Sequence, residues 1–536
     1  MLQTMGYLLI ALFLDGAEFD RFHDDAVNAV GEHQRDHTQG NAQIKNSTCS
    51  HDKKFACQNY EILPCALASS SVNSPSLFET FRDRFPGTPT ADQEAAMHAL
   101  VRYLLEPAEE RLFILKGYAG TGKTTMMRTL AHTLRHIQMR PVLAAPTGRA
   151  AKVLQGQMKR RAYTLHRLLY LTVRDPSGGF SRIRRPNKGT FQVFIVDEAS
   201  MLGDLGEARE LFQDLLRFVA QGEECRLILV GDEAQLPPVG QSFSPALIPR
   251  HVRDHYAWRI GGAALFEVMR QAADSQILAN ATAMRQGLLA SEVRFPALHV
   301  GAEVRRLRDA HEVLEALETA YTCAEPDAVV LTRSNKRAVA YNRQIRSRLL
   351  WREDVLNAGD VVMVVQNNER WMDPEDSAGF IANGDMFEVL SWRNEEERFG
   401  LRFADASLRW LDREDAPNIE AKIVLDALDS ESARLPEASM KALMQGAREE
   451  AQHVPKAQRP AFLREHPYLQ ALQLKFGYAL TAHKAQGGQW RDVFIEWPYV
   501  PDVDEAEFIR WMYTAFTRGQ DRVYLIGFPD STFANP

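Results

Sequence analysis

The segment GYAGTGKT, residues 117–124, decides the fold because it fits the pattern G-x-x-x-x-G-K-[ST]. It follows the apolar run FIL at residues 113–115 and opens a helix-forming stretch, which is the strand–loop–helix context that a phosphate-binding loop requires. Its glycines let the backbone curl so that successive N–H groups point at phosphate oxygens, and the helix start adds its positive dipole end. We predict that this loop binds the phosphates of a nucleotide.

Within the loop, each residue type has a chemical role. Lys123 can reach the β- and γ-phosphates, and the hydroxyl of Thr124 can coordinate Mg²⁺. The alternative is a glycine-rich turn without a ligand, which the surrounding strand and helix disfavour. The expected nucleotide-binding residues of the loop are Gly117, Gly120, Thr121, Gly122, Lys123, Thr124 and Thr125.

Two further strand ends supply groups that nucleotide hydrolysis needs. The apolar run VFIV at 193–196 delivers Asp197 and Glu198 at its C-terminal end, where open α/β sheets bind their ligands. Asp197 would hold Mg²⁺ through water, and Glu198 would orient and deprotonate the attacking water. The segment GDEAQLPP at 231–238 follows the next strand and places the Gln235 amide near the same edge. An isolated Asp-Glu pair is usually a solvated turn, but after an apolar strand in a P-loop protein it indicates a catalytic centre.

Short apolar runs alternate with helical stretches in two parts of the chain, which predicts parallel sheets covered on both faces. The first set comprises residues 113–115, 142–144, 193–196 and 227–230, and the second comprises 329–331, 493–495 and 523–526. Between the two sets, a different pattern predicts a small antiparallel barrel. Its strands are 361–365, 387–390, 401–403 and 422–424, with turns such as 383–385, and an acidic helical stretch follows at 430–472.

The net charge of −7, from 63 Lys and Arg against 70 Asp and Glu, conceals a strong asymmetry. From Arg111 to Val196 there are seventeen basic residues and one acidic residue, Asp175, a local balance of +16. A solvated charged face normally mixes both signs. The stretch therefore predicts a surface kept positive for a polyanion, although the overall charge taken alone argues against a nucleic-acid binder.

Residues 1–76 are interpreted as an appendage that ends in a Ser/Asn/Pro linker at 69–76. Cys49, Cys57 and Cys65, with His51, could supply four zinc ligands, but their seven-residue gaps match no usual finger spacing.

Five cysteines in 536 residues favour a reduced, cytoplasmic setting. The apolar run 5–14 is too short for a membrane span and lacks the preceding positive charge of a signal peptide, so we expect no membrane segment.

Eight motifs, in order, resemble those of superfamily 1 DNA helicases, specifically the RecD/Dda-like branch called superfamily 1B. The motifs are 117–124, 145–151, 164–166, 197–200, 231–238, 269–271, 481–487 and 513–518, and the resemblance covers about residues 80 to 530. It implies an α/β fold with two RecA-like P-loop motor domains, which bind ATP and Mg²⁺ in the cleft between them. The implied domains are motor domain 1A (77–166 and 191–260), a β-hairpin pin 1B (167–190), motor domain 2A (261–355 and 473–536), and an SH3-like barrel insert 2B with the acidic helical stretch (356–472).

The resemblance also implies roles for residues in the cleft. Arg270 and Arg518 match the family's two cleft arginines, which act on the γ-phosphate from the second motor domain. Surface ion pairs are the alternative for both. Gln93 resembles the family's adenine-reading glutamine, and an exposed helix glutamine is its alternative. Gly519 follows Arg518 where the branch usually has Ala, so we expect it to loosen the helix that aims the arginine.

The implied ligand is single-stranded DNA, which the family binds across both motor domains. The matching residues are Pro146, Thr147, Arg149, Thr164 and His166 on the first domain, Arg184 and Arg185 on the hairpin, and Thr481, His483 and Lys484 on the second domain. In the resembling enzymes, a hairpin in this position is the pin that splits the duplex. Tyr170 or Phe180 would then pack on the junction base pair, or would merely staple the hairpin.

Together these features predict an ATP-dependent DNA helicase that moves 5′→3′ along single strands. The direction comes only from the resemblance, and Met269 favours the 5′→3′ branch because the 3′→5′ relatives carry a tyrosine there. The alternative is a translocating or protein-displacing ATPase that does not unwind duplex. We expect a monomer that binds single-stranded DNA and junctions, with replication or repair proteins as further partners and no nuclease activity.

Overall fold

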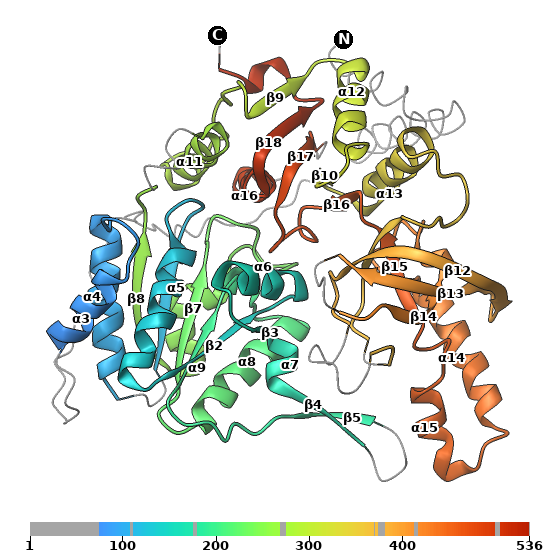
Figure 1. The fold of residues 1–536 in the computed structure, drawn as a ribbon, viewed down its shortest axis with the longest axis horizontal. Helices are drawn as coiled ribbons and strands as arrows, with labels where there is room; N and C mark the ends of the chain where they lie inside the picture. Colours follow the sequence, from blue (N-terminus) through green and yellow to red (C-terminus); the bar gives the residue numbers. More distant parts are fainter. Residues whose placement is uncertain are drawn as a thin grey trace, which may run out of the picture. The chain divides into compact units, whose positions relative to one another are not determined.

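A computed structural model of the chain describes residues 74–107, 111–174, 180–268, 275–368, 370–372, 381–411, 416–498 and 504–534 (Figure 1). They all belong to one compact unit, Val72–Pro536. The candidate zinc ligands Cys49, Cys57 and Cys65 and the motif 269–271, with Met269 and Arg270, lie outside the described residues. In the ranges given above, no helix is both long and apolar enough to cross a membrane.

The first motor domain is built on a six-stranded sheet with the order β3-β2-β6-β7-β1-β8, in which every neighbouring pair is parallel. Its strands are β1 (Arg111–Gly117), β2 (Arg140–Ala145), β3 (Ala162–Thr164), β6 (Gln192–Val196), β7 (Arg226–Gly231) and β8 (Arg259–Leu265). Its main helices are α3 (Ser74–Asp83), α4 (Ala91–Leu105), α5 (Lys123–Thr133), α6 (Gly148–Met158), α7 (Leu165–Leu169), α8 (Gly206–Gln221) and α9 (Pro249–Tyr256), and the 3-10 helix η2 (Leu134–Ile137) follows α5.

Strand alternation distributes the side chains of β1 between two cores of this domain. Phe113 and Leu115 pack into the core that α3, α4 and α5 cover. Leu112 and Ile114 pack into the core on the other face, with residues of α8 and α9. Because both faces are buried, these strands are apolar throughout rather than alternating, as expected for a parallel sheet.

The second motor domain is a five-stranded parallel sheet with the order β16-β10-β17-β18-β9. Its strands are β9 (Val304–Leu307), β10 (Ala328–Thr332), β16 (Ala479–Thr481), β17 (Trp490–Glu496) and β18 (Gly519–Ile526). Its helices include α11 (Gln276–Leu289), α12 (Ala310–Tyr321), α13 (Asn335–Gln344) and α16 (Glu505–Phe516). The prediction of two parallel sheets is confirmed.

The predicted barrel is also confirmed, and it closes on itself in the order β11-β12-β13-β14-β15. It is not wholly antiparallel as predicted, because β14 and β15 pair in parallel. Its strands are β11 (Val361–Val364), β12 (Met386–Arg398), β13 (Leu401–Trp410), β14 (Ile419–Val424) and β15 (Leu472–Phe476). The acidic stretch between β14 and β15 is helical, with α14 (Glu437–Ala451) and α15 (Arg459–Arg464). The hairpin insert of the first motor domain consists of the antiparallel strands β4 (Tyr170–Arg174) and β5 (Phe180–Arg184), and its predicted turn at 176–179 lies outside the described residues.

Three predicted boundaries are wrong. The first motor sheet does not end at residue 260, because β8 pairs with β1 as far as Leu265. The second motor domain does not resume at residue 473, because β15 pairs with β11 and β14 and closes the barrel. The predicted linker does not extend to residue 76, because α3 begins at Ser74 and its Leu77 and Phe81 are buried in the first core.

A buried carboxylate joins the second motor domain to the barrel. Asp360 is 0% exposed and accepts hydrogen bonds from Arg346 at 2.9 Å, Arg352 at 2.9 Å and the Tyr478 hydroxyl at 3.0 Å. Arg346 lies just after α13, whereas Asp360 immediately precedes β11. One carboxylate therefore fixes the path of the chain between the two folding units.

We predict that Asp360→Ala destabilises this junction strongly, because it leaves the buried Arg346 without a counter-charge. Removal of one partner from a buried ion pair costs about 3–5 kcal/mol. Urea denaturation followed by tryptophan fluorescence measures this loss. Asp354→Ala is the control because Asp354 is exposed, and an equal loss in both variants would contradict the assigned role.

Candidate functional site

The loop at residues 117–124 has the geometry of a phosphate cradle. It joins the end of β1 to α5, and Gly120 and Gly122 have φ angles of 76° and 85°, which favour glycine. Thr121 is buried, and its hydroxyl donates to the Tyr118 carbonyl at 2.8 Å, which fixes the curl of the loop. The loop backbone and the N-terminus of α5 are thus positioned to receive phosphate oxygens.

Lys123 lies against its own loop. Its ammonium donates to the carbonyls of Gly117 at 2.7 Å and Tyr118 at 2.8 Å, and it lies 4.0 Å from a carboxylate oxygen of Asp232. Asp232 is 1% exposed, and burial raises the pKa of its carboxyl group. A half-buried cation from the start of α5 and a buried acid from the end of β7 therefore lie close together at the cradle.

The Asp197–Glu198 pair lies at the end of β6, one strand away from β7 and two from β1. Burial, followed by the charge of Glu198, raises the pKa of Asp197 to about 7. Glu198 has a φ of 52°, a left-handed conformation that is costly for a side chain other than glycine and that typically occurs at functional sites. Two adjacent carboxylates that repel each other would gain from a bound divalent cation.

Gln235 lies in the loop after β7, as predicted, and is 5% exposed. Its side-chain oxygen is buried without a hydrogen-bond partner in the described structure. An unpaired buried amide oxygen costs free energy. This atom is therefore available to a ligand or to the water that a ligand orders.

Gln93 is fully buried, so the alternative of an exposed helix glutamine is wrong. Its side-chain oxygen accepts from the Thr90 backbone and its amide donates to the Thr121 carbonyl at 3.0 Å. Gln93 thus caps α4 and holds the backbone of the phosphate loop at Thr121. Adenine reading by this residue stays a prediction.

Tyr513 connects the two motor domains at the cradle, a role that sequence reasoning missed. Its hydroxyl donates to Asp232 at 2.6 Å and accepts from the backbone N–H of Ala119 at 2.9 Å. It is 1% exposed and belongs to α16, whose motif YTAFTR begins with it. One hydroxyl therefore bonds the phosphate loop and the loop after β7 to the second motor domain.

Leu236 lies in the same loop after β7, and both of its backbone polar groups bond side chains of the second motor domain. Its N–H donates to the Thr514 hydroxyl at 2.8 Å, and its carbonyl accepts from the Gln486 amide at 2.8 Å. Three motifs that are far apart in the sequence, 231–238, 481–487 and 513–518, therefore meet at one interface.

Arg518 is buried in the second motor domain, so its alternative as a surface ion pair is wrong. It is 4% exposed and donates to the carbonyls of Thr514 and Gly488, each at 3.1 Å. The expectation that Gly519 loosens the helix before it is also wrong, since α16 ends at Phe516 and Gly519 begins β18. The role of Arg518 as a cleft arginine stays a prediction.

The predicted DNA-binding residues of the first domain flank α6 and α7. Thr147 and Thr164 accept from Ala150 and Arg167 N–H groups at 3.2 Å and cap these helices. Pro146, which precedes Thr147, is half-buried. The Arg149 guanidinium lies 3.8 Å from the centre of the Trp490 ring, so it packs against the second motor domain.

On the second domain, the predicted residues follow β16. Thr481 is its last residue, and burial lowers the pKa of His483 and lowers that of Lys484 to about 8. Sequence reasoning missed Lys475 of β15, whose pKa is also lowered to about 8, by burial and then by Lys484. Partly buried cations that repel each other gain from a bound anion.

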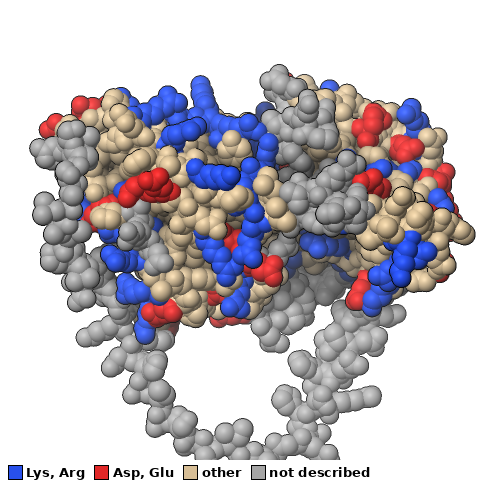
Figure 2. Space-filling model, turned by 90° about the horizontal axis from the view of Figure 1, so that it is seen from below, with Lys and Arg blue, Asp and Glu red and all other residues tan. Residues whose placement is uncertain are grey.

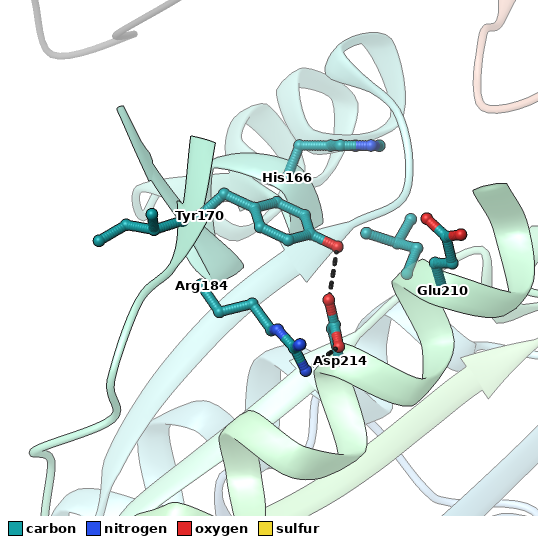
Figure 3. A pocket seen from close by; sticks show the side chains of 7 residues that line it. His166, Tyr170, Arg184, Glu210 and Asp214 are labelled. Atoms are coloured by element: carbon teal, nitrogen blue, oxygen red, sulfur yellow. Dashed lines mark hydrogen bonds and ion pairs between the residues drawn. The ribbon is translucent and has the colours of Figure 1, made fainter. Parts of the chain in front are cut away.

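The hairpin is anchored on α8 beside a pocket of about 450 Å³ (Figure 3). The Tyr170 hydroxyl donates to one oxygen of Asp214 at 3.0 Å, and Arg184 donates to the other at 3.1 Å. This contact supports the staple alternative for Tyr170, whereas the side chain of Phe180 lies outside the described residues. The pocket is lined by His166, Tyr170, Ile183, Arg184, Glu210, Leu211 and Asp214. Arg185, at the end of the hairpin, is exposed.

Basic side chains gather on the first motor domain, as the sequence predicts. Figure 2 shows one face of the molecule, on whose left half Lys and Arg outnumber Asp and Glu. That half contains the first motor domain, which lies on the left in Figure 1 as well.

Family models and curated relatives match parts of this chain. A model described as an AAA domain matches residues 89–305, and a model described as a UvrD-like helicase C-terminal domain matches residues 476–526. The chain is 39% identical over 132 residues to the ATP-dependent RecD2 DNA helicase of Deinococcus radiodurans, a match that covers 25% of this chain and 17% of the relative. It is 29% identical over 162 residues to the ATP-dependent DNA helicase dda of Enterobacteria phage T4, which covers 30% and 35%.

The chain thus matches well under half the length of these two relatives. Among solved structures, the Pif1 helicase from Bacteroides in complex with ADP-AlF3 and ssDNA is 15% identical, with a TM-score of 0.44. That alignment covers 84% of this chain and 95% of the other.

We predict that Tyr513→Phe loosens the contact between the motor domains, because it removes the hydroxyl that serves both Asp232 and the Ala119 N–H. A hydrogen bond to a charged group is worth about 1.5–3 kcal/mol, which corresponds to roughly 10- to 100-fold faster amide exchange where opening is local. Hydrogen-exchange mass spectrometry of residues 117–121 and 231–236 measures it.

The matched control for this substitution is Tyr256→Phe. Tyr256 donates to Asp204 at 3.3 Å, but both residues lie in the first motor domain. Loss of the Tyr256 hydroxyl should leave amide exchange in residues 117–121 and 231–236 unchanged. Unaltered exchange in the Tyr513 variant would contradict the bridging role.

Proposed function

We propose that this chain, which belongs to superfamily 1B of the helicases, is an ATP- and Mg²⁺-dependent DNA helicase that translocates 5′→3′ along single-stranded DNA. The observation that carries the proposal is the interface at Tyr513, where the phosphate loop is bonded to the second motor domain. A nucleotide bound at such an interface can change how the two domains pack. We further propose single-stranded DNA and its junctions with duplex as ligands, with action as a monomer in the cytoplasm alongside replication or repair proteins.

In this proposal, the first motor domain supplies the hydrolytic groups. Thr124 and Asp197 would hold Mg²⁺, which neutralises phosphate charge when bound. The raised pKa of Asp197 fits this role, since a cation at the site favours its ionised form. Lys123 would leave its two carbonyl partners for the β- and γ-phosphates. Glu198 would take the proton of the attacking water, and the unpaired oxygen of Gln235 would orient that water.

The second motor domain would stabilise charge on the γ-phosphate. Arg518 would exchange its carbonyl partners in α16 and at Gly488 for the phosphate when the domains close, together with Arg270. Tyr513 of α16 bonds the phosphate loop, and α16 ends two residues before Arg518. A shift of the phosphate loop would therefore move α16 and, with it, Arg518. Hydrolysis would then reverse the shift.

The two domains would hold the strand alternately. Thr147 and Thr164 cap helices of the first domain, and Lys484 lies on the second, where a phosphate would restore its pKa. The hairpin would separate the duplex, because it projects from the first domain and is anchored by Asp214 (Figure 3). A translocating ATPase that displaces proteins without unwinding is the alternative, and the hairpin favours unwinding.

Strand displacement on duplexes with a single-stranded tail tests this proposal. We expect ATP-dependent displacement from a duplex with a 5′ tail and at least tenfold less from one with a 3′ tail. Lys123→Ala and Glu198→Gln should abolish it together with DNA-stimulated ATP hydrolysis, while Glu223→Gln, which alters an exposed carboxylate of the first domain, should not. ATP hydrolysis without displacement from either substrate would favour the alternative, and a 3′ preference would overturn the polarity.

We predict that Asp214→Ala separates unwinding from hydrolysis. It removes the carboxylate that both Tyr170 and Arg184 bind, so the hairpin loses its anchor while the nucleotide cradle is untouched. Displacement should fall at least about fivefold, with single-strand-stimulated ATP hydrolysis within twofold of the parent. Glu210→Ala, in the wall of the same pocket, is the control. Equal loss of both activities would contradict a pin-specific role.

A further inference from the structure

A cluster of basic side chains lies on the first motor domain, away from the nucleotide cradle. It consists of Arg84, Arg128, His132, Arg135 and Arg160, and we name it the α5–α6 basic patch. All of these residues are exposed except Arg160, which is half-buried. Arg84 reaches the patch from the end of α3, where it donates to the His132 carbonyl at 3.0 Å. Three separate chain segments, at residue 84, at 128–135 and at residue 160, therefore contribute to one positive surface.

The direction of the helices fixes where this patch lies. α5 begins at the phosphate loop, and α6 begins just after Thr147, the predicted DNA grip. Arg128 lies in the middle of α5, whereas His132, Arg135 and Arg160 lie at or beyond the C-terminal ends of the two helices. Each helix has eleven residues, which at 1.5 Å per residue places its far end about 16 Å from its start. The patch therefore belongs to the opposite edge of the domain from the cleft and the single-strand channel.

The cations of the patch are close enough to repel one another. Burial and then the charges of Arg160, Arg135, Arg84 and Arg128 lower the pKa of His132. Arg160 has its own pKa lowered by burial and by Arg135. None of these four arginines forms an ion pair with a carboxylate in the part of the chain that the structure describes. Such uncompensated repulsion is a cost that a bound polyanion would remove.

Interaction with helix dipoles is the simplest alternative explanation. Cations near helix C-termini are stabilised by about 0.3–1 kcal/mol, and His132 and Arg160 lie near such ends. This effect favours a cation at the C-terminal end of each helix. It does not explain why acidic residues are almost absent from the rest of the stretch. The stretch 111–196 has one acidic residue against seventeen basic ones, which the dipoles do not explain.

The patch is continuous with the base of the hairpin. Arg161 follows Arg160 and lies 5.0 Å from the ring of Tyr163 on the edge strand β3, and Arg167 lies 5.8 Å from the same ring. Arg167 belongs to α7, which leads directly into β4 of the hairpin. A positive strip thus runs from the far edge of the domain to the element that would divide the duplex.

We propose that the α5–α6 basic patch binds the phosphate backbone of double-stranded DNA ahead of the hairpin. The patch contains no Phe, Tyr or Trp, whereas surfaces for single strands need aromatic side chains on which bases stack. Duplex DNA hides its bases and presents phosphates, which exposed arginines bind without regard to sequence. The inference rests on the proposed function for its placement of the duplex at the hairpin.

Equilibrium binding without nucleotide tests the proposal, measured by fluorescence anisotropy. The probes are a 5′-tailed DNA duplex and the same tail as a single strand. Arg135→Glu with Arg160→Glu should weaken binding of the tailed duplex at least tenfold at low salt and leave the single strand within twofold. The slope of log affinity against log salt should fall by about 2 for the duplex, since each lost phosphate contact contributes about 0.9.

Two further variants separate charge from structure. Arg135→Lys with Arg160→Lys should keep duplex affinity near the parent value, because phosphate binding requires the charge and not the guanidinium. Arg294→Glu with Arg308→Glu reverses two exposed arginines of the second motor domain and should have no selective effect. Thermal unfolding of each variant shows whether the fold is retained, and Arg135→Gln with Arg160→Gln replaces the reversal if it is not.

Three results would overturn the proposal. They are unchanged duplex affinity, an equal loss on the single strand, and tighter patch-dependent binding of an RNA duplex than of the DNA duplex. The test is independent of the proposed function, because no step requires ATP. A parent protein that binds duplex through the patch but neither hydrolyses ATP nor displaces strands would defeat the proposed function alone.

Discussion

The hydroxyl of Tyr513 is the contact on which the arrangement of the two motor domains depends. It is held between a backbone donor of the phosphate loop at 2.9 Å and the buried carboxylate of Asp232 at 2.6 Å. A buried carboxylate is costly unless it is hydrogen-bonded, so the second domain completes the first rather than merely resting on it. The same helix, α16, ends just before Arg518, so the geometry of the phosphate loop and the placement of Arg518 are mechanically linked.

Helix α6 provides the second connection, and small residues permit it. A side chain at Gly148 would come within 2.6 Å of Asp385 in the barrel, and one at Gly487 would come within 2.7 Å of Ala150. Lys152 of α6 pairs with Asp385 at 3.3 Å and lies 4.6 Å from the ring of Trp410. The helix that carries the predicted DNA grip of the first domain therefore contacts both the barrel and the second domain. Motion of one domain relative to the other must alter this helix's surroundings.

The sequence predicted the elements that a local pattern of residues determines. It did not predict strands and side-chain contacts that depend on partners far away in the chain. The strands of both motor sheets were predictable because runs such as 193–196 are apolar throughout, and the phosphate loop because its spacing is specific. Strand β8 reads RIGGAAL, which lacks a strong apolar signal, and β15 is separated from its barrel partners by α14 and α15. Gln93 and Tyr513 were recognised as motif residues, but their partners lie on other elements and cannot be read from spacing.

The charge of the chain illustrates why placement matters more than sums. The balance of +16 in residues 111–196 is offset by an acidic remainder of the chain. The net charge of −7 therefore describes neither the cleft edge of the first motor domain nor its α5–α6 basic patch. Because α5 and α6 both start at the functional edge and end at the far edge, cations on one continuous stretch are divided between two surfaces about a helix length apart. At physiological salt, charges farther apart than about 8 Å are largely screened, so each surface attracts its own segment of polyanion. A fold that alternates strand and helix can thus convert one basic stretch of sequence into two separate binding surfaces.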